Sequence, residues 1–198
     1  MRRVCSTPFR YKMTMGAETA MNLLILGATG SIGRHLTEQA LERGYDVTAL
    51  VRDPSKLDTT TDPHLHAMRG NALEPHDVDR AVHSQQAVLY ALGTRELLRP
   101  VTMFSESTRI LIDAMKRHGV RRLIAITGIG AGDSKGHGGF FYDQILYRFL
   151  TKPMYEDKDR QEELIRASGL DWTIVRPAVF TNKDGNQPLR ALTDLRGV

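Results

Sequence analysis

The stretch from Leu23 to Gly33, LLILGATGSIG, constrains the fold more than any other part of the chain. Residues 21–26 form a short apolar run that is typical of a buried parallel strand, and the run stops at Gly27. From Ser31 onward, apolar residues recur at the spacing of one helical face. A strand, a glycine-rich turn and the start of a helix therefore follow one another directly.

The glycine-rich turn predicts where a negatively charged ligand would bind. Glycines allow a sharp turn, a close approach of the backbone to a pyrophosphate, and tight packing of the helix on the strand. The free N–H groups of the first helical turn then face the anion. The spacing is GxxGxxG rather than GxGxxG, and glycines also end strands in plain turns, but the flanking strand and helix favour a dinucleotide. The predicted binding turn consists of Gly27, Ala28, Thr29, Gly30, Ser31, Ile32 and Gly33.

Strand and helix patterns continue to alternate beyond this turn. Further strands are expected at residues 46–51, 64–68, 87–92, 122–126 and 171–175. Helices are expected at residues 74–83, 103–118 and 156–168, and Pro153 is expected to interrupt the helical pattern before the last of them. This β-α-β-α alternation predicts an α/β fold, in which a doubly wound parallel sheet carries helices on both faces in three αβα layers.

The composition bounds the number of domains. With 198 residues and 41% hydrophobic content, the chain can bury one sizeable core, so a single dinucleotide-binding domain is expected over residues 21–198. Residues 1–20 carry four basic side chains against one glutamate and show no clear periodicity, so we expect a disordered basic N-terminal extension. Such a leader can also be a transit peptide, but the methionines at positions 13, 15 and 21 favour an upstream start or a flexible arm.

Charge, cysteine content and hydropathy argue against several classes of protein. The net charge is +4, but the chain has no zinc-finger spacing, RNA-binding aromatic signature or long basic stripe, so no nucleic acid partner is expected. The single cysteine, Cys5, excludes an internal disulfide framework and a thiolate metal cluster. No apolar run reaches the roughly 20 residues of a membrane helix, and no signal-peptide pattern is present. We therefore expect no metal site, no membrane partner and a cytoplasmic location.

The end of the second strand carries a basic residue where dinucleotide-binding folds select their cofactor. An acidic residue about 20 residues after the glycine turn holds the ribose 2′-hydroxyl of NAD, whereas a basic residue accommodates the 2′-phosphate of NADP. Arg52 stands close to that distance, and Arg34 and Lys56 could assist it, although Asp53 is its immediate neighbour. A solvated strand-end arginine is the alternative, but we interpret Arg52 as favouring NADP.

Other candidate residues follow the remaining strands, because ligands of open α/β sheets bind outside the carboxyl ends of the strands. Asn71, followed by Ala72, could reach an adenine edge or could form an Asx turn. Gly93 would lie beside the cofactor if the sheet is parallel. Thr127 is placed to meet a substrate carbonyl, although it could equally be an ordinary sheet residue. The glycine-rich stretch 128–139 suits an active-site lid, and a plain surface loop nearly as well.

Several ordered motifs together resemble one protein family. GATGSIGRHL, VRDPSKL, SESTRILIDAMKRHGVRRLIAITGIGAGDS and DKDRQEELIRASGLDWTIVRP are similar to sequences of the atypical short-chain dehydrogenase/reductases, specifically the NmrA-like NAD(P)H-binding group that contains flavin reductase/biliverdin reductase B. The resemblance runs from about Met21 to the C-terminus. It implies a Rossmann fold with strand order 3-2-1-4-5-6. It also implies NADP bound by the glycine turn, Arg52, Asn71, Ala72, Ala91, Leu92, Gly93, Thr127, Lys158 and the loop that begins at Pro177.

The chain departs from the family's catalytic pattern. The wider family uses Ser, Tyr and Lys, with the tyrosine four residues before the lysine. Lys158 aligns with that lysine, but Met154 occupies the tyrosine position and Tyr155 is one residue out of register, which would rotate its side chain by about 100° on a helix. Thr127 replaces the serine, and Asn71 replaces the usual aspartate at the adenine. The chain also stops soon after the sixth strand, where relatives continue into a final helix, so we expect a truncated product or a sheet surface that a partner covers.

Two functions compete on these grounds. The first is an NADPH-dependent oxidoreductase that transfers hydride to a small conjugated acceptor, such as a quinone, a flavin or a carbonyl compound. In that reaction Lys158 would bind the nicotinamide ribose and Thr127 would hydrogen-bond the acceptor oxygen, whereas reduction of an isolated ketone is disfavoured because the tyrosine is displaced. The second is a cofactor-sensing regulatory or assembly protein that binds NADP without turnover. Either would act as a monomer or homodimer.

Overall fold

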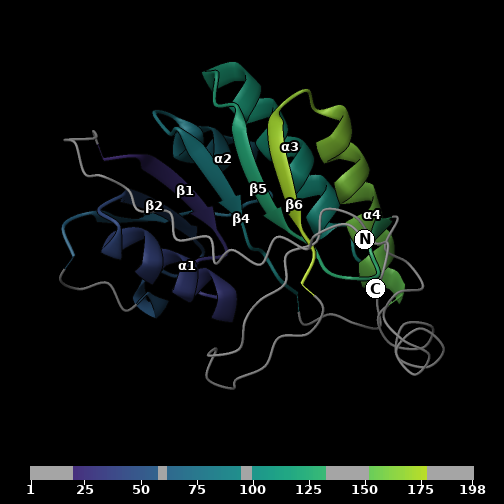
Figure 1. The fold of residues 1–198 in the computed structure, drawn as a ribbon, viewed down its shortest axis with the longest axis horizontal. Coiled ribbons are helices and arrows are strands. Elements are labelled where there is room, and N and C mark those ends of the chain that lie inside the picture. The colour runs from purple at the N-terminus through teal and green to yellow at the C-terminus, as the bar shows by residue number, and fades with distance from the viewer. Residues whose placement is uncertain (1–19, 58–61, 95–99, 133–151, 178–198) are drawn as a thin grey trace, which may run out of the picture.

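The structure is a computed structural model that describes residues 20–57, 62–94, 100–132 and 152–177. Six parallel strands form one sheet with the order β3-β2-β1-β4-β5-β6 (Figure 1). The strands are β1 (Asn22–Leu26), β2 (Asp46–Val51), β3 (Leu65–Arg69), β4 (Ala87–Tyr90), β5 (Arg122–Ile126) and β6 (Asp171–Val175). The predicted doubly wound sheet and its strand order are therefore confirmed.

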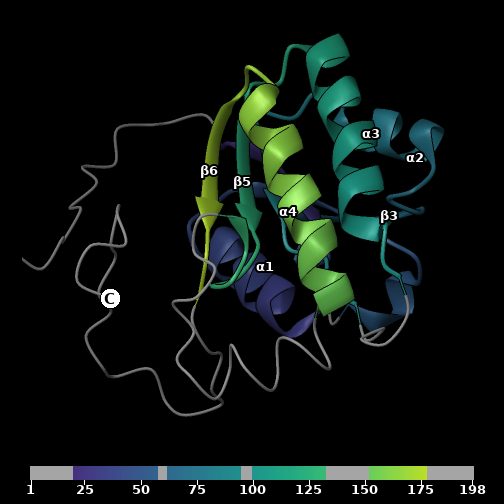
Figure 2. The ribbon, with the colours of Figure 1, turned by 90° about the vertical axis from the view of Figure 1, so that its right-hand side faces the viewer.

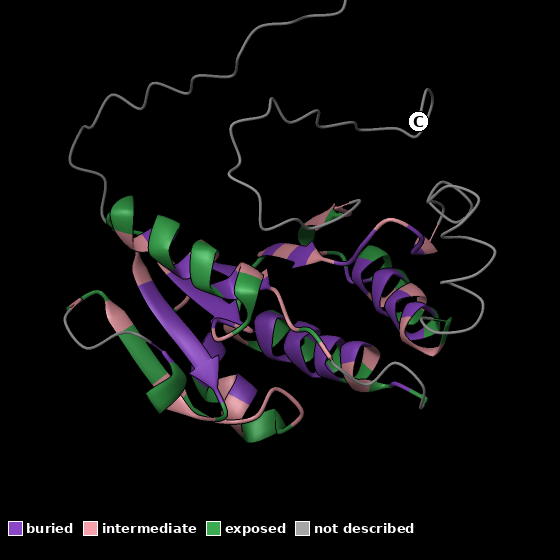
Figure 3. Cartoon of the chain, turned by 90° about the horizontal axis from the view of Figure 1, so that it is seen from below, coloured by how far each residue is buried: buried purple, intermediate pink, exposed green. Residues whose placement is uncertain are grey.

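The helices lie on both faces of this sheet. They are α1 (Ser31–Glu42), α2 (Pro75–Val82), α3 (Met103–His118) and α4 (Lys152–Ala167), with a short 3₁₀ turn η1 (Pro54–Lys56) after β2. Alternate residues of β1 show the two faces: Leu24 packs in the core with α2, α3 and α4, and Leu23 packs in the core with α1. Figure 2 shows α3 and α4 side by side on one face, and Figure 3 shows that the buried residues gather on the strands and on the inward sides of the helices.

Most predicted boundaries agree with the structure, and the differences have local causes. Strands β2, β5 and β6 and helix α3 occupy the predicted residues. Strand β4 ends at Tyr90 rather than at residue 92, which leaves residues 91–93 outside the ladder. Helix α4 begins at Lys152, four positions before the predicted start, because Pro153 lies in its first turn, where a helix needs no backbone N–H donor. Pro153 therefore belongs to the start of this helix, whereas the helical run expected before it, at residues 140–150, lies outside the described residues.

Three expectations concern residues outside the described ranges. They are the basic extension at 1–19, the glycine-rich stretch beyond residue 132, and the segment after Pro177. Among the residues that the structure describes, no helix is both long enough and apolar enough to cross a membrane.

Candidate functional site

The glycine turn packs against the end of β4. Gly27 has a φ of +90°, and a Cβ at this position would overlap the backbone of Ala91 and approach Leu92 N to 2.9 Å. A Cβ on Gly33 would overlap the Gly27 carbonyl group. Gly30 is different, because it is exposed, has a φ of −77°, and its Cβ would meet only Gly27 O at 3.3 Å. The packing of the protein thus requires glycine at positions 27 and 33, while Gly30 faces outward, where a ligand would approach.

Helix α1 begins at this turn with its positive end uncovered. Its N-cap residue is Gly30, no side chain caps it, and its first turn contains no acidic residue. The first intrahelical bond runs from Arg34 N to Gly30 O at 2.9 Å. The N–H groups of Ser31, Ile32 and Gly33 have no acceptor within the helix and carry the positive end of its dipole. The turn is therefore built to receive an anionic group.

Arg52 lies at the end of β2 and is exposed, with no hydrogen-bond or ion-pair partner among the described residues. Its acidic neighbour is already occupied: Asp53 Oδ1 accepts hydrogen bonds from Ser55 N at 3.2 Å and Ser55 Oγ at 2.7 Å. These bonds, with help from Lys56, hold the pKa of Asp53 below its usual value. Asp53 caps η1 and leaves the Arg52 guanidinium available to a ligand.

Arg34 and Lys56, which could assist Arg52, make local contacts. The Arg34 guanidinium donates to Thr29 O at 3.3 Å and to Lys56 O at 3.2 Å, so it links the glycine turn to η1. Lys56 Nζ lies 3.7 Å from Asp53 Oδ2. Arg34 therefore helps to hold the turn next to η1.

In the turn after β3, Asn71 forms the Asx turn that was one of the two predictions for it. Asn71 Oδ1 accepts a hydrogen bond from Leu73 N at 3.1 Å, which is an Asx turn. Asn71 N donates to Asp77 Oδ2 at 2.9 Å, and Ala72 is half-buried in the same turn. After β4, Ala91 N donates to Leu26 O at 2.8 Å, and exposed Gly93 has open space where a Cβ would point. Residues 91–93 therefore lie beside the glycine turn.

Thr127 follows β5, and its hydroxyl group faces α4. The side chain is buried, and Thr127 Oγ1 donates to Glu162 Oε1 at 2.8 Å. Thr127 N donates to Val175 O at 3.0 Å, which continues the pairing of β5 with β6. The hydrogen that we expected Thr127 to offer an acceptor oxygen is therefore used by Glu162 in this structure.

Lys158 of α4 reaches the same edge of the sheet. Its side chain is 9% exposed, Nζ donates to Thr127 O at 2.5 Å, and Nζ lies 5.0 Å from the centroid of the Phe104 ring. Burial lowers the pKa of Lys158 to about 8, and the negative charge of Glu162 opposes this shift. An ammonium group has three donors, and Thr127 O takes one of them, so further donors remain for a ligand.

Tyr155 points toward this edge as well, which differs from the sequence-based expectation. The side chain is 8% exposed, and a Cβ on Gly128 would lie 3.2 Å from the Tyr155 hydroxyl oxygen. Residues three apart on a helix are rotated by about 300°, which is only about 60° from full alignment, so Tyr155 and Lys158 share a face of α4. Met154 instead packs against the core on the face of the sheet that carries α2, α3 and α4. The prediction that Tyr155 is turned away from the site is therefore wrong.

Sequence reasoning missed two buried carboxylates on α4, Asp157 and Glu162. Asp157 is fully buried and caps α3 from outside: its Oδ2 accepts from Phe104 N at 2.8 Å and Ser105 N at 3.3 Å. Thr102, the N-cap residue of α3, supplies no side-chain cap of its own. Asp157 therefore fixes the start of α3 against α4, next to Lys158.

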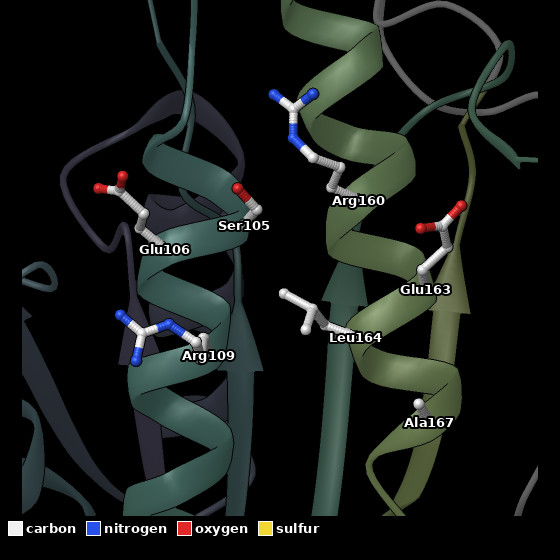
Figure 4. A pocket seen from close by; sticks show the side chains of 7 residues that line it. All are labelled: Ser105, Glu106, Arg109, Arg160, Glu163, Leu164 and Ala167. Carbon is white, nitrogen blue, oxygen red and sulfur yellow. The ribbon is translucent and has the colours of Figure 1, made fainter.

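A groove between α3 and α4 lies next to Asp157, which Ser105 and Arg160 contact from its lining. Its volume is about 470 Å³, and Figure 4 shows the side chains that line it, which are Ser105, Glu106, Arg109, Arg160, Glu163, Leu164 and Ala167. None of them belongs to the predicted site. Within the described part of the chain, no group of three or more His, Cys, Asp or Glu side chains could hold a metal ion.

A comparison with protein families agrees with this geometry. The profile of a family described as NAD(P)H-binding matches residues 27–196, which include the glycine turn and every other candidate residue. The chain belongs to the NAD(P)H-binding family. The resemblance seen in the sequence is thereby confirmed at the level of a dinucleotide-binding family with a Rossmann-like fold.

Relatives of this NAD(P)H-binding protein carry different names. It is 32% identical to an uncharacterized chloroplastic protein of Arabidopsis thaliana, over 86% of this chain and 65% of the relative. It is 29% identical to the 3-diazoavenalumate denitrifying reductase of a Streptomyces species, over 87% of this chain and 62% of the relative. It is 25% identical to the photosystem II assembly factor Ycf39 of Synechocystis, over 81% of this chain and 45% of the relative. The chain thus spans between 45% and 65% of the length of these relatives.

Solved structures show the same architecture. A Rossmann-fold NAD(P)-binding family protein from Shigella flexneri superposes with a TM-score of 0.63 and 27% identity. The match covers 86% of this chain and 78% of the Shigella chain. The NAD(P)H-binding family and the fold are thus established together.

Proposed function

We propose that this protein is an NADPH-dependent oxidoreductase that transfers a hydride to a small conjugated acceptor, such as a quinone, a flavin or a carbonyl compound. The observation that carries the proposal is the place of Lys158. Its Nζ lies at the carboxyl end of β5, at the same edge of the sheet as the glycine turn of β1. A dinucleotide whose pyrophosphate binds the N-terminus of α1 would extend along this edge toward Lys158.

NADPH is the proposed cofactor because of Arg52. The guanidinium is exposed, and the only acidic side chain next to it in sequence, Asp53, is occupied by Ser55. An exposed arginine at this position suits a 2′-phosphate, with which it can form charge-assisted hydrogen bonds.

The residues around Lys158 have distinct roles in this proposal. The remaining donors of Nζ bind the hydroxyl groups of the nicotinamide ribose and orient the ring, and the cofactor supplies the hydride. Lys158 and Tyr155 are both buried, so this part of the site has little access to water. The Tyr155 hydroxyl group lies next to Gly128, on the same face of α4 as Lys158, so Tyr155 is the proposed source of a proton for a carbonyl acceptor.

The proposal is tested by mixing the purified protein with NADPH and either menadione, FMN or a conjugated aldehyde, and by following the loss of nicotinamide absorbance. Lys158→Ala should weaken NADPH binding by about 10-fold, the effect of losing roughly 1.4 kcal/mol of hydrogen bonding. Lys152→Ala is the matched control, because this lysine of α4 is exposed and, among the described residues, Nζ is paired with Glu156 Oε1 at 3.7 Å. Unchanged NADPH affinity in Lys158→Ala would show that Lys158 does not bind the cofactor.

Tyr155→Phe separates the classes of acceptor. Reduction of a carbonyl needs a proton on the new alkoxide, whereas a reduced quinone or flavin can take its proton from water. We therefore expect kcat for the aldehyde to fall by about 10- to 100-fold, with kcat for menadione unchanged. An equal fall for both acceptors would contradict a role as proton donor.

The second candidate function is binding of NADP without turnover, in a regulatory or assembly protein. Two observations favour it: Thr127 gives its hydroxyl hydrogen to Glu162, and one group of relatives is named as photosystem II assembly factors. Tight NADPH binding with no oxidation by any of the three acceptors would support this function and reject the first.

A further inference from the structure

Glu162 of α4 lies between the ends of β5 and β6. Its side chain is fully buried, and Oε1 accepts hydrogen bonds from Thr127 Oγ1 at 2.8 Å and Arg176 Nε at 3.0 Å. Oε2 accepts from Arg166 Nη2 at 2.9 Å and Arg176 Nη2 at 2.5 Å. Each carboxylate oxygen therefore has two donors, which offsets the cost of burying the charge. One side chain thus connects two strand ends to the helix that carries Lys158.

The segment after β5 is fitted to the same carboxylate. Gly132 has a φ of +57°, and a Cβ there would lie 2.5 Å from Glu162 Oε2 and 2.8 Å from Arg176 Nη2. Gly132 N donates to Asp159 Oδ1 at 2.7 Å, one turn of α4 before Glu162. Ile129 N donates to Pro177 O at 3.0 Å. Residues 127–132 and 176–177 are therefore held to each other and to α4.

These contacts are separate from the part of the site that would bind phosphates. The hydrogen-bond partners of Glu162 are Thr127, Arg166 and Arg176, and none of them lies in the glycine turn or beside Arg52. Strand β5 is separated from β1 by β4, and from β2 by β4 and β1. Loss of the Glu162 charge should therefore disturb one end of the site and leave the other unchanged.

Stability alone does not require an ion cluster here. Replacing a buried ion pair by well-packed apolar side chains is often neutral or stabilising, whereas a bidentate arginine–carboxylate pair fixes the relative position of the groups that carry it. Thr127 is fixed at three atoms, since its N–H donates to Val175 O, its hydroxyl donates to Glu162 and its carbonyl oxygen accepts from Lys158. The cluster thus specifies a geometry at the edge of the sheet where an acceptor would bind.

We propose that Glu162 is a positioning residue for the hydride acceptor: it holds residues 127–132 and 176–177 in the arrangement that binds the acceptor, and acts through Thr127 and Arg176. The inference rests on the proposed function only in placing the acceptor at this edge.

Glu162→Gln tests the proposal, with Glu163→Gln as the matched control. Glu163 is the next residue of α4, is exposed and has no partner among the described residues. In Glu162→Gln, amide hydrogen exchange should speed up by about 10-fold or more in residues 127–132 and 172–177, since their anchors open locally. Exchange in residues 22–42 should stay as in the wild type. Glu163→Gln should match the wild type throughout.

Binding and turnover give the second readout. In Glu162→Gln, kcat/KM for menadione should fall by about 10-fold or more, chiefly through KM. The dissociation constant of NADPH should rise by less than the roughly 10-fold expected for Lys158→Ala, because the glycine turn and Arg52 stay as they are. Thr127→Val removes the hydroxyl group that donates to Glu162 and should resemble Glu162→Gln. If Glu162→Gln does not fold, Arg176→Lys, which keeps the charge but loses the bidentate pairing, should give the same local pattern.

Three results would overturn the proposal: unchanged exchange at residues 127–132, equal acceleration in every segment, or an unchanged KM for menadione in a variant whose exchange has increased. A wild-type protein that oxidises NADPH with none of the acceptors would reject hydride transfer and, with it, the acceptor role of Glu162. Amide hydrogen exchange in Glu162→Gln would then still test whether Glu162 holds residues 127–132 and 176–177 together.

Discussion

Replacing Arg52 with alanine should remove most of the preference for NADP over NAD and leave the fold intact. The guanidinium is exposed and unpaired among the described residues, so its loss leaves no buried group without a partner. A hydrogen bond to a charged group contributes about 1.5–3 kcal/mol, which corresponds to a roughly 10- to 150-fold change in the dissociation constant. Because solvent screens an exposed arginine, we expect the lower half of this range for NADP.

The assay is a titration of wild-type and variant protein with NADPH and with NADH, at low and at high ionic strength, followed by nicotinamide fluorescence. NADPH affinity of the wild type should fall with salt more steeply than NADH affinity, and Arg52→Ala should remove most of that difference. Arg43→Ala is the matched control, since this arginine at the end of α1 is exposed and its side chain, among the described residues, donates to Gln39 O at 2.7 Å. Equal losses for both cofactors would refute the assignment of Arg52 to the 2′-phosphate.

Three other substitutions probe the rest of the site. Gly30→Val should abolish NADPH binding, because the new side chain would crowd the pyrophosphate. The variant should still fold, since the Cβ would meet Gly27 O at 3.3 Å and no other described atom within 4 Å. Retained affinity in the folded variant would contradict the placement of the pyrophosphate at this turn. Burial lowers the pKa of Lys158 to about 8 from 10.5, so the unfolded chain binds more protons between these values. The free energy of unfolding of the wild type, relative to that of Lys158→Met, should therefore rise by up to roughly 3 kcal/mol between about pH 8 and about pH 10 in denaturant titrations. If this difference between the two proteins stays constant with pH, the lowered pKa of Lys158 is contradicted. Asp157→Asn should lower the free energy of unfolding by about 1–2 kcal/mol through loss of the charged cap of α3, whereas Asp113→Asn on the exposed face of α3 should not; equal effects would contradict the cap.

The sheet could be predicted because its strands have strong local patterns. Val47, Val88 and Leu123 lie in short apolar runs bounded by polar or glycine residues, and each is fully buried. At Gly27 the apolar run gives way to helical spacing, which identified the first β-α-β connection. Because such connections are nearly always right-handed, a doubly wound parallel sheet was favoured. The family resemblance supplied the strand order.

The side of the site on α4 could not be predicted in the same way. Asp157 and Glu162 lie in a highly charged stretch, DKDRQEE, where charged side chains usually face solvent. Their burial depends on partners far along the chain, since Asp157 caps α3 and Glu162 binds Thr127 and Arg176. Tyr155 was misplaced because the family spacing of four residues was taken as the only one that brings a tyrosine beside the lysine, although a spacing of three also does so.

The strand order separates the candidate determinants of two properties, the choice of nicotinamide coenzyme and the binding of the acceptor. Arg52, the candidate determinant of cofactor choice, follows β2, whereas Thr127 and Arg176 follow β5 and β6, on the other side of β1 and β4. Glu162 is hydrogen-bonded to Thr127, Arg166 and Arg176, whereas Asp53 and Asn71 accept hydrogen bonds within η1 and within the turn after β3. Changes at the end of β2 that redirect the protein from one nicotinamide coenzyme to the other should therefore combine additively with changes on α4 that alter its acceptor.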